Sequence, residues 1–358
     1  MQEEMPQPVT FRREVIGPAM RTVGVGDSCC LVGVGSSGKS NIAWHMKRPD
    51  VLKYYHGPRA PAIVSVLVDG LKLSNYTAQS LCALILESLL EALPSLDLQV
   101  MGASNLEAAM THFADVSPAE RGRQKLGWVL DELVTKGIHL VIFMLDDFDH
   151  VIQKMPTTAL NLLRALRDRH KGKVAYVVLT RRELAFLRDE SECQDFVEIV
   201  SPTTFAIGPY SSADAHFMAR QLIARWLLAS RVPPAARARL VQISGCHPGL
   251  LKTIFTLIRN DEAIDGLSPN LMDMLNQNHD IAVECRKIWD SLETEERVGL
   301  QMLSHGAPLS VETAALLQAK GLIHRPDRKT HFNFFTPLFS YFVSQNVAFG
   351  QTERTQPK

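Results

Sequence analysis

Eight consecutive residues near the amino terminus have the types and spacing needed to bind phosphate. They match the pattern G-x-x-x-x-G-K-[ST], after a short apolar run and before a helical segment. Glycines let the backbone curl so that successive N–H groups converge on phosphate oxygens at a helix N-terminus, where the helix dipole also favours negative charge. The expected phosphate-binding residues are the eight residues of the motif and the one that follows it: Gly33, Val34, Gly35, Ser36, Ser37, Gly38, Lys39, Ser40 and Asn41.

Two side chains of this loop have separate chemical roles. Lys39 would reach the β- and γ-phosphates of a nucleotide and take part in catalysis, and the Ser40 hydroxyl would bind magnesium. The alternative is a chance match in a loop rich in glycine and serine. The apolar run before the loop and the helical segment after it favour the phosphate site, because the motif works in that context.

A second group of reactive side chains follows an apolar run at residues 140–145. The run ends in Asp146, Asp147, Phe148 and Asp149, and in parallel α/β sheets ligands bind at the carboxyl ends of the strands. Asp146 would therefore hold the magnesium, and Asp147 would orient or polarise the attacking water. The alternatives are an acidic loop that caps a buried strand, or a calcium loop. A calcium loop needs alternating acidic residues followed by glycine, a pattern that is missing here.

A third apolar run, residues 175–179, ends in Thr180, Arg181 and Arg182. A cation at the tip of a strand beside the Asp146 strand is well placed to sense a γ-phosphate. We take Arg181 as the candidate and Arg182 as the second choice. The alternative is a solvated pair of charges that starts a helix.

From residue 28 to about residue 207, short apolar runs alternate with longer helical segments, and these elements must position the residues above. Short apolar runs without polar alternation are typical of parallel strands covered by helices on both faces. Helical periodicity is clearest at residues 76–93 and 157–170. The pattern predicts an α/β fold with a parallel sheet. The five expected strands are residues 28–34, 63–70, 139–147, 174–180 and 196–202.

The pattern changes in the last 150 residues or so. From residue 211 to about 278 the strand signal disappears and Ala, Leu and Arg dominate. From residue 284 to 347 the order is helix, helix, two short strands around the polar turn 326–329, and helix, which suggests a winged helix. We expect an N-terminal arm, partly disordered, at 1–20, a core at 21–208, a helical lid at 209–280, a winged helix at 281–347 and a disordered tail at 348–358.

Composition excludes several classes of protein. The chain has 358 residues, 46% of them hydrophobic, and 38 Lys+Arg balance 38 Asp+Glu. A stably unfolded chain has low hydrophobicity and high net charge, and a protein that coats nucleic acid nonspecifically has a large positive excess, so both classes are excluded. The six cysteines form no Cys-x-x-Cys pair, which indicates reduced core residues. The start of the chain lacks a signal-peptide pattern, and no apolar run approaches the roughly 20 residues of a membrane span. We therefore expect a soluble, cytoplasmic protein.

Four segments together resemble a known class of ATPase. They are the phosphate loop, the acidic strand end, and residues 177–184 and 244–251. The set resembles STAND-class P-loop ATPases and the closely related origin-initiator branch of AAA+ proteins, over about residues 21–347. The resemblance implies a P-loop core with lid and winged helix, ATP or ADP with Mg²⁺ as ligands, Pro248 near the adenine, and self-association. STAND regulators carry an effector and a sensor, which we expect on separate polypeptides.

One departure from the family pattern concerns catalysis. Many ring-forming AAA+ relatives place Glu after the magnesium-binding Asp, whereas this chain has Asp147, which is one methylene shorter. We expect slow hydrolysis and a nucleotide switch, not a continuous motor. A candidate arginine finger is Arg167, against the alternative of a solvent-facing charge.

The expected winged helix has two possible roles. Its helix at residues 311–320 has one acid, one base and no arginine, so it lacks the side chains that read base edges. The resemblance favours a winged helix that packs on the nucleotide site when ADP is bound and moves away with ATP, with His247 or His331 contacting a β-phosphate. The alternative is DNA contact through the basic wing, which holds His324, Arg325, Arg328, Lys329 and His331.

The leading functional prediction is a STAND-type ATPase that switches conformation or oligomeric state in signalling or defence. The alternative is a DNA-engaging AAA+ loader or transposition regulator. A third possibility is a nucleotide-binding scaffold without useful hydrolysis.

Overall fold

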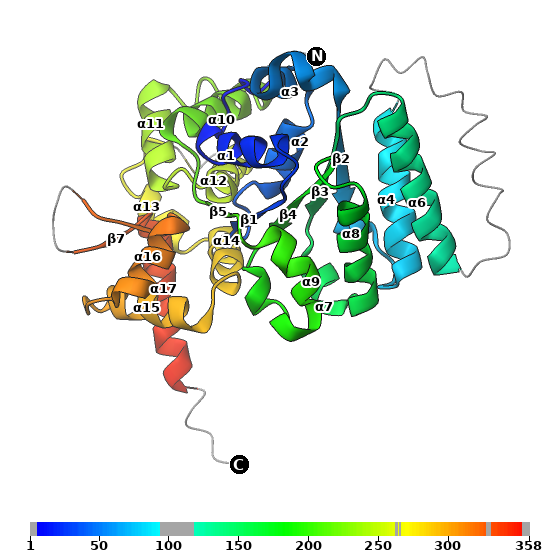
Figure 1. Cartoon of the computed structure of the whole chain (residues 1–358). Coiled ribbons are helices and arrows are strands. Elements are labelled where there is room, and N and C mark those ends of the chain that lie inside the picture. Colours follow the sequence, from blue (N-terminus) through cyan, green and yellow to red (C-terminus); the bar gives the residue numbers. More distant parts are fainter. Residues whose placement is uncertain (1–5, 94–117, 262–263, 265, 327–330, 353–358) are drawn as a thin grey trace. The chain divides into compact units, whose positions relative to one another are not determined.

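The computed structural model describes residues 6–93, 118–261, 264, 266–326 and 331–352, and it divides the chain into two compact units (Figure 1). The core unit comprises Val9–Val32 and Lys39–Phe205. The C-terminal unit comprises Met1–Pro8, Gly33–Gly38 and Ala206–Lys358. The segments expected as lid and winged helix therefore lie in one unit, together with most of the phosphate loop.

The described residues form a five-stranded parallel sheet, which confirms the predicted α/β fold. Its order is β2-β3-β4-β1-β5, so the strand that ends in Asp146 lies beside the strand that ends before Arg181. β3 and β4 are buried at every position, which explains their unbroken apolar sequences. The strands are β1 (Cys29–Gly33), β2 (Ile63–Asp69), β3 (Leu140–Asp146), β4 (Val174–Thr180) and β5 (Thr204–Ile207).

The fifth expected strand, residues 196–202, was assigned wrongly. These residues end the helix α9 (Glu190–Val200), and the fifth strand, β5, follows it. Cys193, Phe196, Val197 and Val200 are buried while Glu198 is exposed. That i, i+3, i+4, i+7 spacing is typical of a helix. The strand was assigned from residues 196–202 alone, which include only the last apolar turn of α9.

Helices cover both faces of the sheet in the core unit. On one face, α4 and α6 lie side by side (Figure 1), and with α8 and α9 they bury a continuous apolar cluster. On the other face, α1 packs on β4, and α2 packs on β2 and β3. The bounds are α1 (Arg13–Gly24), α2 (Lys39–Met46), α3 (Pro49–His56), η1 (Gly57–Ala62), η2 (Gly70–Lys72), α4 (Ala78–Ala92), α6 (Pro118–Thr135), α7 (Asp149–Lys154), α8 (Thr157–Arg169) and η4 (Leu184–Phe186).

The N-terminal boundary differs from the expected one. Ile16, Ala19 and Met20 on α1 are completely buried, so the second half of the segment expected as an arm is a packed helix. All six cysteines are thiols in the structure, and all except Cys246 are buried.

The C-terminal unit is helical with one small hairpin. Residues 288–305, which the sequence predicts as one helix, belong to two helices, α14 and α15, because a turn at 291–293 leads into a capping box at Glu293. α17 runs to Thr352, into the expected tail. No described helix is both long and apolar enough to cross a bilayer. The elements are α10 (Ser212–Arg225), α11 (Pro234–Ile243), α12 (Pro248–Asn260), α13 (Leu271–Asn276), α14 (His279–Asp290), α15 (Thr294–Ser304), α16 (Val311–Ala319), β6 (Ile323–His324), β7 (Asn333–Phe334) and α17 (Pro337–Thr352).

A buried ion pair joins α15 to the end of α16. The Lys320 Nζ lies 2.6 Å from Glu296 Oε1, and their side chains are only 6% and 2% exposed. Glu296 Oε2 also accepts the Glu293 N–H at 2.9 Å. Removing one partner would leave the other charge buried and uncompensated.

We expect Lys320→Met to lower the free energy of unfolding by about 3–5 kcal/mol. The double variant Glu296→Gln/Lys320→Met should lose less, because no charge remains buried. Urea denaturation of the three proteins measures both values, and Lys252→Met, on the exposed face of α12, is the surface control. A double variant as unstable as the single one would contradict the expectation.

Candidate nucleotide-binding site

The core unit brings the predicted lysine, serine and aspartate together at the carboxyl end of the sheet. Lys39 and Ser40 begin α2, and Asp146 ends β3. The Ser40 hydroxyl donates a hydrogen bond to the Asp146 carboxylate, and the Asp147 N–H donates to Asp146 Oδ1 at 3.0 Å. Ser40 and Asp146 thus place side by side two oxygen groups of the kind that Mg²⁺ prefers.

Burial changes the charge behaviour of this cluster. It lowers the pKa of Lys39 to about 8, an effect that the neighbouring carboxylate of Asp149 opposes. Burial also raises the pKa of Asp146, against the hydrogen bond from Ser40. Lys39 and Asp146 are both removed from water, so their charged forms are poorly stabilised. A bound polyanion would stabilise the charge of Lys39, and a bound divalent cation would stabilise the charge of Asp146.

Asp147 and Arg181 lie next to each other at the same edge. Arg181 Nη2 is 3.7 Å from Asp147 Oδ1, and the Arg181 N–H donates to Asp149 Oδ1 at 2.9 Å. Asp147 has a φ of 48°, a left-handed conformation that costs about 1–3 kcal/mol and is common at functional sites. The Arg181 side chain is 55% exposed, and Arg182 is half-buried. The structure therefore places the expected sensor beside the expected water-orienting group.

In the C-terminal unit, the phosphate loop packs against the helices that follow it in sequence. Gly38 has a φ of 87°. A methyl group at Gly38 would lie 3.1 Å from the Tyr210 hydroxyl and 3.6 Å from Pro248 Cγ. Pro248, in the first turn of α12, is therefore close to the loop. Its expected place near the adenine stays a prediction. Tyr210 was not predicted, because a single Tyr after a strand carries no motif.

α14 also lies on the loop, at Gly35. The Gly35 N–H donates to Ser291 Oγ at 2.8 Å, and a methyl group at position 35 would collide with the Lys287 carbonyl oxygen. Glu284, one turn earlier, lies against Gly249. Glu284, Lys287 and Ser291 were not predicted from the sequence, because they look like the ordinary polar positions of an amphipathic helix.

The remaining predicted residues have other surroundings. Val34 is buried and Asn41 is exposed. His247 is fully buried at the N-cap of α12, where its Nδ1 accepts the Leu250 N–H at 3.3 Å, whereas His331 is exposed. Arg167 is only 15% exposed and pairs with Asp27 and Asp168, so this candidate finger is held within its own core unit. Arg328 and Lys329 lie outside the described residues.

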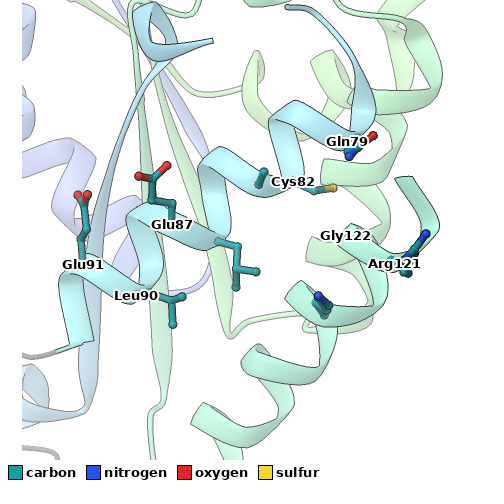
Figure 2. Close-up of a pocket in the computed structure, with 10 residues that line it drawn as sticks. Gln79, Cys82, Glu87, Leu90, Glu91, Arg121 and Gly122 are labelled. Atoms are coloured by element: carbon teal, nitrogen blue, oxygen red, sulfur yellow. The ribbon is translucent and has the colours of Figure 1, made fainter. Parts of the chain in front are cut away.

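A separate cavity lies between α4 and α6 (Figure 2). Its volume is about 910 Å³, and the two helices approach closely beside it, since a methyl group at Gly122 would be 2.8 Å from Cys82 Cβ. None of the predicted phosphate or metal residues lines it. The lining residues are Gln79, Cys82, Ala83, Leu86, Glu87, Leu90, Glu91, Arg121, Gly122 and Lys125.

Comparisons with known proteins give structural neighbours only. No family model matches the chain, and no curated protein matches it. The Walker-type ATPase PABY2304 of Pyrococcus abyssi is 12% identical with a TM-score of 0.48, over 95% of this chain and 99% of that one. ORC1 of Aeropyrum pernix in complex with DNA is 12% identical with a TM-score of 0.40, over 97% of each chain. Drosophila ORC bound to DNA is 12% identical with a TM-score of 0.46, over 96% of this chain and 83% of that one.

Proposed function

We propose that this chain is an ATP-binding, slowly hydrolysing AAA+ ATPase that works as a nucleotide-dependent switch. The observation that carries the proposal is the contact of α14 with Gly35 in the phosphate loop. The end of a helix of the C-terminal unit therefore contacts the loop that would hold phosphate. A ligand that binds one arrangement better than another shifts the population toward it, so nucleotide at the loop and the position of α14 are coupled.

The residues divide the chemistry among them. ATP with Mg²⁺ supplies the phosphoanhydride bond and neutralises charge as that bond breaks. Lys39 holds the phosphates, and Ser40 with Asp146 holds the metal. Asp147 orients the attacking water, and Arg181, 3.7 Å from Asp147, responds to the γ-phosphate. The short reach of Asp147 makes the reaction slow, as a switch requires.

We assign residues 209–280 as a helical lid and 281–347 as a winged helix. In the STAND role, the chain self-associates or engages a separate effector or sensor protein in signalling or defence. The exposed face of α16 supports a protein partner, because it carries one acid and no base; its residues are Val311, Glu312, Ala315, Leu316, Gln318 and Ala319.

DNA engagement by an origin-initiator-like ATPase is the second candidate, and the lid favours it. The lid (209–280) holds seven Lys and Arg against six Asp and Glu, and all seven bases fall within residues 211–260. The one acid of that part, Asp214, is buried. Arg220, Arg225, Lys252 and Arg259 are exposed. Such a basic surface attracts a phosphate backbone without reading its sequence. Two structural neighbours are also complexes with DNA.

One experiment tests the proposal and separates its two candidates. We expect purified protein to hydrolyse ATP below about one turnover per second, the low end of enzyme rates. ATPase rate and particle size are measured with and without duplex DNA across a salt series. DNA-dependent assembly with a steep salt slope supports the loader, and indifference to DNA supports the signalling switch. Sustained turnover far above that rate without any partner would contradict the switch.

A further inference from the structure

Glu284 is a buried carboxylate with one unsatisfied oxygen. The residue is 4% exposed, and its Oε1 has no hydrogen-bond partner in the part of the chain that the structure describes. Its Oε2 accepts a hydrogen bond from Lys287 Nζ at 2.7 Å, but the Lys287 side chain is 53% exposed. Burying a carboxylate with one oxygen lacking a hydrogen bond costs free energy, so the surroundings of Glu284 must offer a compensating role.

The unsatisfied oxygen lies at the phosphate loop. A methyl group at Gly249 would collide with Glu284 Oε1 and would lie 2.6 Å from Ser36 Cβ. The carboxylate and the loop residue Ser36 therefore both lie against the same glycine. Gly249 is needed there, since no larger residue leaves room for both.

The end of α14 brings further negative groups to the same loop. The Lys287 carbonyl oxygen and Ser291 Oγ belong to the last turn and cap of α14 and contact Gly35. The C-terminal end of a helix carries partial negative charge, whereas a phosphate loop gathers N–H groups for an anion. α14 thus presents to the loop the kind of charge that a nucleotide phosphate would bring.

We propose that Glu284 makes the packed position of α14 incompatible with a bound polyphosphate. With α14 on the loop, the buried carboxylate places a negative charge beside it. When nucleotide phosphates bind, these like charges repel and α14 leaves. The repulsion grows with the number of phosphates. Through Glu284, a nucleotide with more phosphates displaces α14 from the loop more strongly. This inference rests on the proposed nucleotide switch.

The test compares the wild type with Glu284→Gln, which keeps the shape and removes the charge. Affinity is measured by calorimetry for adenosine, AMP, ADP and a non-hydrolysable ATP analogue with Mg²⁺, and hydrogen exchange is followed in the α14 amides. We expect the variant to bind the ATP analogue about tenfold tighter or more, with a smaller gain for ADP and none for adenosine. The analogue should speed α14 exchange in the wild type and not in the variant.

Two further variants keep the outcome decisive. Asp280→Asn removes an exposed carboxylate from the first turn of the same helix and should change nothing. Ser291→Ala frees the Gly35 N–H and should raise both the affinity and the exchange of α14 without nucleotide. Equal gains for adenosine and ATP, or wild-type affinity and exchange in Glu284→Gln, would overturn the role of Glu284. Wild type that binds no nucleotide would instead overturn the proposed function itself.

Discussion

Lys39→Ala is expected to remove ATP hydrolysis and most nucleotide affinity. The lysine is 7% exposed at the start of α2, so its charge acts where water screens little. Removing one preorganised electrostatic contact to a reacting group costs about 10²–10³ in rate. We therefore expect turnover to fall by about 10³ and the dissociation constant for the ATP analogue to rise about 100-fold or more.

Steady-state ATPase assays and calorimetry measure the two effects of Lys39→Ala. Lys53→Ala is the matched control, because Lys53 is an exposed lysine on the neighbouring helix α3. Circular dichroism establishes that each variant is folded. Lys39→Ala with wild-type affinity and turnover would remove the phosphate loop from the mechanism.

Asp146→Asn should separate nucleotide binding from hydrolysis. The substitution keeps the shape of the side chain and removes the charge that, in our proposal, holds Mg²⁺ with Ser40. We expect turnover to fall by about 10³, while affinity for the ATP analogue in the presence of EDTA stays near the wild-type value. In the wild type, added Mg²⁺ should raise affinity, and in the variant this rise should be largely lost.

The sheet provides a close control for Asp146→Asn. Asp69 is the register partner of Asp146 at the carboxyl end of β2, but its Oδ1 accepts the Leu71 N–H at 3.0 Å. Asp69→Asn should leave turnover and its Mg²⁺ dependence unchanged. Equal losses in both variants would mean that the sheet edge tolerates no substitution, and the assignment of Asp146 as the metal ligand would fail.

Local patterns were enough to predict most of the core unit. Four of the five strands were recognised because buried parallel strands carry unbroken apolar sequence, and Asp146 and Arg181 were located by their position after such runs. α9 was missed because its last apolar turn looks like a strand when its first turn is ignored. The break between α14 and α15 was missed because a capping box begins with Glu293, a residue that also suits a helix interior.

By itself, the sequence determined the phosphate loop, the acidic strand end and the parallel sheet, because each depends on residue types at fixed spacing along a short segment. Only the tertiary structure decided which groups face these residues. Lys287 and Ser291 reach Gly35 across about 250 residues of chain, and Glu284 and Ser36 both lie against Gly249. Such contacts follow from how helices pack, not from local propensity. The contact of α14 with the phosphate loop was therefore not predictable, because the polar residues of this helix gave no local sign of that role.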